Sequence, residues 1–116
     1  MKSDRIYLSH ILECIRKIEE DTNGGRTAFN QSHLIQDAVI RNLQVIAEST
    51  KRLSDATKAK EPQVNWAGIA GLRNLLVHDY FSVDLGIVWK IVSENVPHLK
   101  NSAERLMESV PGDPAL

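Results

Sequence analysis

Apolar residues recur along this chain three and four positions apart, which is the pattern of helices that bury one face. The first stripe predicts a helix that begins after Ser3 or Asp4, both good capping residues, and ends near Asp21, before a pair of glycines. The second stripe predicts a helix from residues 30–32 to Leu53, with a kink or restart at residues 49–50. Residues 54–64 are mainly polar and predict a connector.

The second half of the chain continues the helical pattern. A helix is predicted from about Asn65 toward His78, and Asp84 is placed to cap the next one. Pro97 is predicted to break the chain and to occupy the first turn of a shorter last helix. Since no segment shows the sustained alternation of a strand, the sequence predicts an all-α antiparallel bundle of four to five helices. In this interpretation residues 1–110 form one domain and residues 111–116 a disordered tail.

The composition limits the classes of protein to consider. With 116 residues, 42% of them hydrophobic and 25% charged, the chain can bury a core without disulfides or a structural metal. There is no signal-peptide core and no membrane-spanning run, and Cys14 is the only cysteine, so we expect a cytoplasmic protein. The net charge of −1 argues against a protein that coats nucleic acid. Residues 41–60, with five basic and two acidic residues (+3), leave room for a focal contact.

The most informative motif is Arg73, four residues, His78, one residue and Tyr80. The planar fork of an arginine matches phosphate oxygens, and a histidine readily exchanges protons near neutral pH. On one regular helix, however, Arg73 and His78 point about 140° apart. Either the helix ends or tightens near His78, or a second copy of the motif completes the site, which predicts a two-fold dimer.

If the target is RNA, these residues suffice for cleavage without a metal or other cofactor. His78 could remove the proton from a ribose 2′-hydroxyl or protonate the leaving oxygen, while Arg73 stabilises charge on the phosphoryl oxygens. Asn74 could position the substrate, and Asp79 could orient His78. The alternative is structural: Arg73 in a salt bridge, Tyr80 as an amphipathic plug and His78 as a cation at a helix end.

Two stretches of the chain, one of which contains the motif, resemble the HEPN superfamily, specifically its HepT-like toxin branch. Residues 65–84 contain the motif between Trp66 and the segment Phe81-Ser82-Val83-Asp84, and residues 35–48 are similar to the second helix of that family. The resemblance runs from about Asp4 to about Leu106. Glu48 matches an acidic position that the family places near its site, although Ala47 stands where a glycine is usual.

The resemblance implies an all-α, homodimeric, metal-independent ribonuclease that is the toxin of a toxin–antitoxin pair. Arg73 and His78 would be catalytic, and Asn74, Glu48 and Asp79 would position the substrate. The partner would be an MntA-type nucleotidyltransferase antitoxin, which transfers AMP from ATP to Tyr80. Such a modification would put negative charge and bulk at the RNA entrance, and the two proteins could form a larger hetero-oligomer.

Two other functions stay open at this point. The chain could be a non-enzymatic HEPN subunit that docks a nucleotidyltransferase, or a purely structural dimerisation bundle. His10 and Cys14 are spaced as two metal ligands on a helix, but no third ligand is apparent, and a position on a helix surface or interface is favoured. Trp66 and Trp89 are interpreted as packing anchors.

Overall fold

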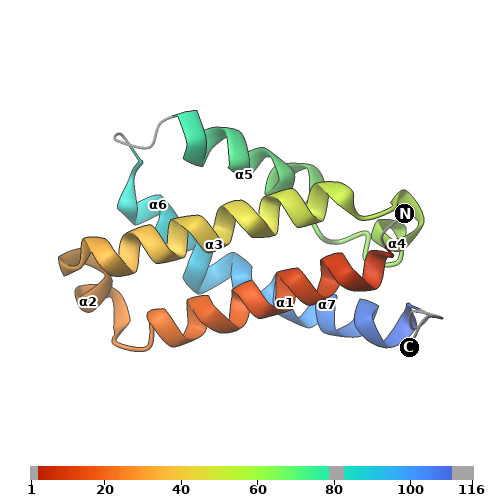
Figure 1. Ribbon diagram of the computed structural model, residues 1–116, viewed down its shortest axis with the longest axis horizontal. Coiled ribbons are helices and arrows are strands. Elements are labelled where there is room, and N and C mark those ends of the chain that lie inside the picture. Colours follow the sequence, from red (N-terminus) through yellow and green to blue (C-terminus); the bar gives the residue numbers. More distant parts are fainter. Residues whose placement is uncertain (1–2, 79–82, 111–116) are drawn as a thin grey trace.

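Long helices lying side by side form the body of the protein (Figure 1). The computed structural model describes residues 3–78 and 83–110, and for residues 73–78 it describes the backbone only. Three of the long helices are α1 (Asp4–Asp21), α3 (His33–Arg52) and α5 (Trp66–His78). A fourth rod joins α6 (Leu85–Lys90), the π-helical turn η2 (Ile91–Asn95) and α7 (Val96–Ser109). Two short helices, α2 (Gly25–Gln31) and α4 (Asp55–Ala59), lie at opposite ends of the bundle.

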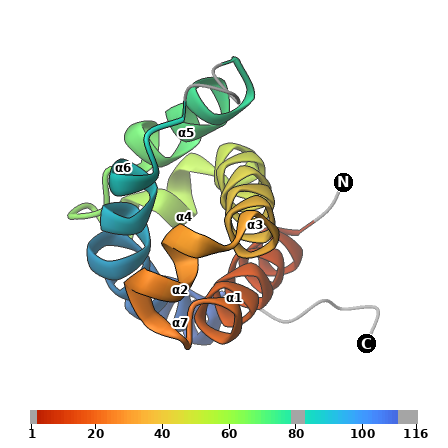
Figure 2. The ribbon, with the colours of Figure 1, turned by 90° about the vertical axis from the view of Figure 1, so that its left-hand side faces the viewer.

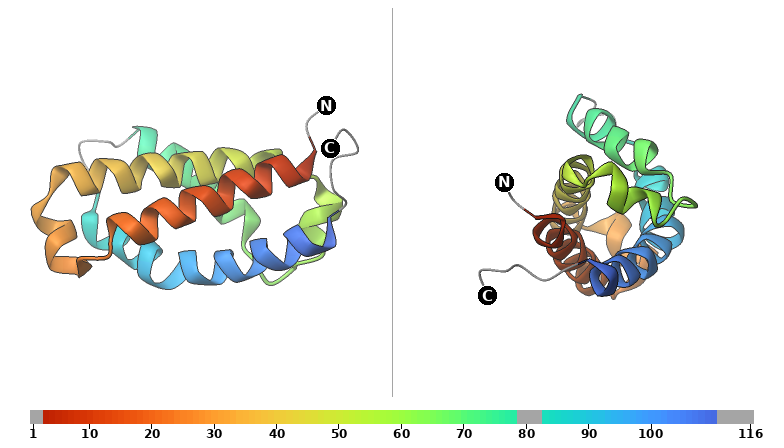
Figure 3. Two further views of the ribbon diagram at one scale, coloured as in Figure 1. Left: turned by 60° about the horizontal axis from the view of Figure 1, so that its bottom comes forward. Right: turned by 90° about the vertical axis from the view of Figure 1, so that its right-hand side faces the viewer.

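The described residues contain helices and no strand, which confirms the predicted all-α bundle. Neighbouring long helices run antiparallel, and the molecule measures 45 by 26 by 25 Å (Figure 3). No helix in the described ranges combines the length and the apolar character needed to cross a membrane.

The apolar stripes of the sequence form the core. Leu8, Ile11, Ile15 and Ile18 of α1 are almost completely buried against a matching stripe of α3. Trp89 packs its ring against the buried Phe29 of α2, with ring centroids 5.4 Å apart. Trp89 therefore serves as a packing anchor, as predicted.

The predicted kink at residues 49–50 is wrong, because α3 continues without interruption to Arg52. Ser49 and Thr50 are 4% and 0% exposed, so these short side chains fill buried positions within the apolar stripe. Residues 54–64, predicted as a connector, are partly helical, and so is the stretch between the first two predicted helices. Phe29 anchors α2 in the core, and the side chain of Ser54 caps α4 by accepting from the amide of Thr57.

Pro97 does not break the chain. It lies in the first turn of α7, as predicted, but the backbone on both sides of it is helical, from α6 through η2 to α7. A proline has no amide hydrogen, and its ring collides with the carbonyl group four residues earlier in a regular helix. The wider turn of η2 directly before it provides the room.

Candidate functional site

Helix α5 carries the first part of the predicted catalytic motif. Its α-helical backbone runs from Trp66 to His78, so it includes Arg73, Asn74 and His78. The helix ends at His78 but does not tighten before it. The Cα atoms of Arg73 and His78 therefore lie about 140° apart around the helix axis. Asp79 and Tyr80 lie outside the described residues, as does the predicted disordered tail, residues 111–116.

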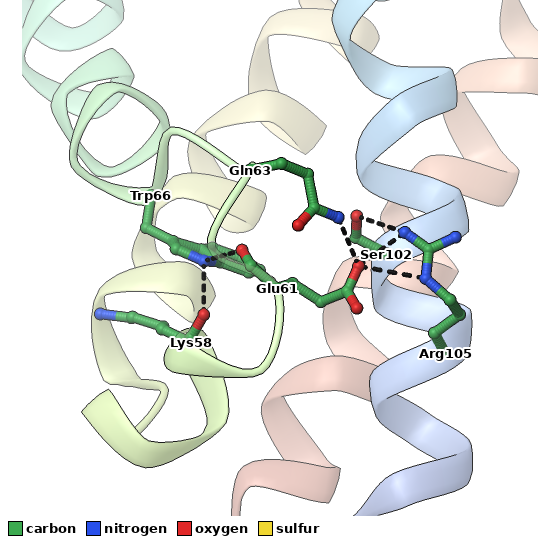
Figure 4. Close-up of polar contacts among 6 residues, drawn as sticks. All are labelled: Lys58, Glu61, Gln63, Trp66, Ser102 and Arg105. Carbon is green, nitrogen blue, oxygen red and sulfur yellow. Dashed lines mark hydrogen bonds and ion pairs between the residues drawn. The ribbon is translucent and has the colours of Figure 1, made fainter.

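The start of α5 is held by hydrogen bonds to the preceding loop (Figure 4). The indole Nε1 of Trp66 donates to the carbonyl oxygens of Lys58 and Glu61, both at 3.1 Å. Asn65 accepts from the amide of Gly68 at 3.0 Å, as a residue at a helix start does. Trp66 is thus a packing anchor that fixes where the motif helix begins.

Helix α5 packs against α3 through apolar side chains. Ile69 and Leu72 of α5 line one small apolar cavity with Ile46 and Leu43 of α3. The two helices run antiparallel (Figure 1).

Glu48 lies near the C-terminal end of α3, four residues before its last residue, Arg52. Its Oε1 accepts from Nη2 of Arg52 at 3.1 Å, and this contact together with Tyr7 raises the pKa of Arg52.

Sequence reasoning did not single out Asp37, an exposed residue of α3. Asp37 and Glu48 are eleven residues apart, close to three full turns, and so share one face of α3.

His10 and Cys14 lie in different surroundings. Cys14 is buried, and burial raises the pKa of its thiol. His10 is exposed and packs edge-on against the ring of Tyr7, with centroids 6.1 Å apart. Across the part of the chain that the structure describes, no three His, Cys, Asp or Glu side chains gather as metal ligands.

A family model and individual relatives of this chain point to the same family. Residues 11–106 match the family model described as "Ribonuclease HepT-like". A Methanocaldococcus jannaschii protein named "Gamma-glutamylcyclotransferase and putative RNase" is 39% identical over 110 residues, covering 94% of this chain. The chain spans 50% of that relative's length. The "Probable ribonuclease HepT" of Thermococcus cleftensis is 37% identical over 108 residues, which cover 90% of this chain and 96% of the relative. No solved structure matches the chain significantly.

Proposed function

This chain belongs to the HepT-like ribonuclease family, and we propose from this premise that it is an endoribonuclease toxin that cuts RNA with Arg73 and His78, without a metal ion. The observation that carries the proposal is the motif itself, which lies inside the matched residues 11–106. Both residues lie on α5, whose start is hydrogen-bonded to the preceding loop.

The chemistry requires a base, an acid and a group that stabilises charge. A histidine removes the proton of the ribose 2′-hydroxyl, and the resulting oxygen attacks the adjacent phosphorus atom. The bond from phosphorus to the 5′-oxygen breaks, and that oxygen takes up a proton from a histidine imidazolium. The products are a 2′,3′-cyclic phosphate and a 5′-hydroxyl group. Arg73 stabilises the negative charge that builds on the phosphoryl oxygens, Asn74 and Glu48 position the substrate, and Asp79 orients His78.

A homodimer would complete the site. Gly71 is exposed and lies seven residues before His78, which puts their Cα atoms on one face of α5. Viewed along the bundle, α5 lies at its edge beside α3 (Figure 2). Ala67, Gly68 and Gly71 are exposed there, and small residues allow a second backbone to come close. A partner that packs over this face would meet the side of α5 that carries His78.

Tyr80 would be the site of regulation. In this proposal an MntA-type nucleotidyltransferase antitoxin transfers AMP from ATP to the Tyr80 hydroxyl and releases pyrophosphate. The added phosphate charge would repel RNA and the adenosine would obstruct its entrance.

Cleavage of labelled RNA by the purified protein in the presence of a metal chelator tests the proposal. His78→Ala and Arg73→Ala should each lower the rate by about 10²-fold or more, because each removes a group that acts in the transition state. His33→Ala, which changes an exposed histidine at the start of α3, is the matched control and should retain full activity. An inactive wild-type protein would instead support the non-enzymatic subunit, and an active His78→Ala protein would contradict the assignment of catalytic residues.

A further inference from the structure

A groove of about 490 Å³ separates the loop before α5 from α7. Val64, Ile69 and Leu99 give it an apolar floor, since Leu99 is buried and the other two are half-buried. The walls come from the loop and the start of α5 on one side and from η2 and α7 on the other. The groove thus combines an apolar base with polar walls, as small-molecule and nucleobase sites do.

Four carboxamide side chains line these walls: Gln63, Asn65, Asn95 and Asn101. None of the described residues that line the groove is Asp or Glu. Asn95, Asn101 and the neighbouring His98 are exposed, and their side chains make no hydrogen bond to any other described residue. Their donors and acceptors are therefore available to a ligand.

In the rod formed by α6, η2 and α7, these polar side chains lie on a different face from the core residues and the charged residues. Its residues form a core face of Leu99, Ala103 and Leu106, a charged face of Lys100, Glu104 and Glu108, and a groove face of Asn95, His98, Asn101 and Arg105. The only guanidinium on the groove face is already paired, because Nε and Nη2 of Arg105 donate to Glu61 (Figure 4). The groove consequently offers neutral hydrogen-bonding groups more than positive charge.

The groove is aligned with the motif along α5. Ile69 lines the groove, and Arg73 follows it by four residues, which places the two Cα atoms within about 40° of each other around the axis and about 6 Å apart along it. A strand that runs along this face of α5 would reach Arg73 within about two stacked nucleotides of the groove.

We infer that this groove binds unpaired nucleobases of the RNA next to the cleaved bond, on the Arg73 side. The inference rests on the proposed ribonuclease function and names the part of the substrate that the groove holds. Carboxamides donate and accept at once and so match the edges of bases, which also do both. The apolar floor suits the face of a base ring. Because the walls carry little net charge, the contribution of the groove to binding should depend only weakly on salt.

The test uses the full chain with His78→Ala, so that RNA is bound without being cut. Fluorescence anisotropy measures its affinity for single-stranded RNA of about ten nucleotides, within the range of sites for single strands. Adding Asn95→Ala and Asn101→Ala should weaken binding about ten- to hundred-fold, the range expected for lost base contacts. The loss should shrink as the RNA is shortened and vanish when the bases are replaced by abasic sugars. The salt dependence should stay unchanged.

Asn23→Ala with Asn30→Ala is the matched control, because both asparagines are exposed and lie far from the groove residues in sequence. This control should bind RNA like the parent, and thermal unfolding should show that both double variants are folded. Equal binding by the groove variant and the control, while the wild-type protein cuts RNA, would overturn this inference alone. Wild-type protein that neither cuts nor binds RNA would overturn the proposed function as well. Groove-dependent binding of free AMP as tight as that of RNA would overturn the assignment to RNA.

Discussion

Glu61 and Arg105 lie 44 residues apart and meet in a two-point ion pair, in which Nε and Nη2 of the arginine donate to Oε1 of the glutamate at 3.1 and 2.6 Å. The Glu61 side chain is only 12% exposed. The backbone carbonyl oxygen of Glu61 also accepts from the indole of Trp66 (Figure 4). One residue therefore joins the loop, the first turn of the motif helix and α7.

Glu61→Gln should lower the stability near neutral pH and make it less dependent on pH. The hydrogen bond from Arg105 holds the pKa of Glu61 below its usual range. The folded protein therefore binds fewer protons than the unfolded chain, so this stabilisation is complete above the ordinary carboxylate pKa of about 4.3 and is lost as the pH falls through the folded pKa. Urea unfolding of both proteins across the acidic range measures the effect. Glu108→Gln, at an exposed site of α7, is the control and should keep the wild-type pH dependence.

Asp4→Ala should destabilise the protein by about 1–2 kcal/mol, the usual effect of removing the acceptor of several hydrogen bonds. Asp4 accepts from the amide of Ser54 at 3.0 Å and from the hydroxyls of Ser54 and Thr57. Burial opposes its ionisation, but these hydrogen bonds outweigh burial and lower its pKa. Chemical denaturation measures the loss, and Asp4→Asn, which keeps one acceptor oxygen, should recover part of it. Wild-type stability of Asp4→Ala would show that the tie between α1 and α4 contributes nothing.

The helices that the sequence predicted well are those whose own apolar stripe decides their position. The stripe of α1 sets both ends of that helix to within a residue of the prediction. The short α2 and α4 have no such stripe, and contacts from elsewhere fix them: the core around Phe29 and the carboxylate of Asp4. Asp4 was predicted as a capping residue of its own helix, and its partners 50 and 53 residues away are not visible in local sequence.

The motif could be recognised in the sequence, whereas the groove could not. Arg73, Asn74 and His78 lie within six residues, so their spacing and chemistry could be recognised directly. The groove draws on residues 63–69 and 95–105, and isolated asparagines in a sequence have no distinguishing pattern. Only the fold, with the π-helical turn before Pro97 that continues α6 into α7, brings these amides together.

Gly71→Arg should convert the proposed dimer to a monomer and lower RNA cleavage, while the fold is retained. A Cβ atom built at Gly71 meets no atom within 4 Å, so the new side chain has room in the single chain. Arginine also favours a helix more than glycine does, by up to about 1 kcal/mol. Sedimentation velocity measures the change of mass. Ser9→Arg, on the exposed surface of α1, should remain dimeric, and a dimeric Gly71→Arg protein would exclude close packing over this face.

Tyr80→Phe should abolish AMP transfer and leave RNA cleavage intact, because it removes the acceptor oxygen but keeps the ring. The chain contains only one other tyrosine, Tyr7, which makes Tyr7→Phe a matched control. After co-expression with the nucleotidyltransferase, intact-mass measurement should show wild type and Tyr7→Phe heavier by whole AMP units, and Tyr80→Phe unchanged. In the cleavage assay, the modified wild type and Tyr7→Phe should no longer cut RNA, whereas Tyr80→Phe should remain active. A mass increase that survives in Tyr80→Phe would move the modification to another residue, whereas silencing of Tyr80→Phe without a mass increase would show inhibition by docking alone.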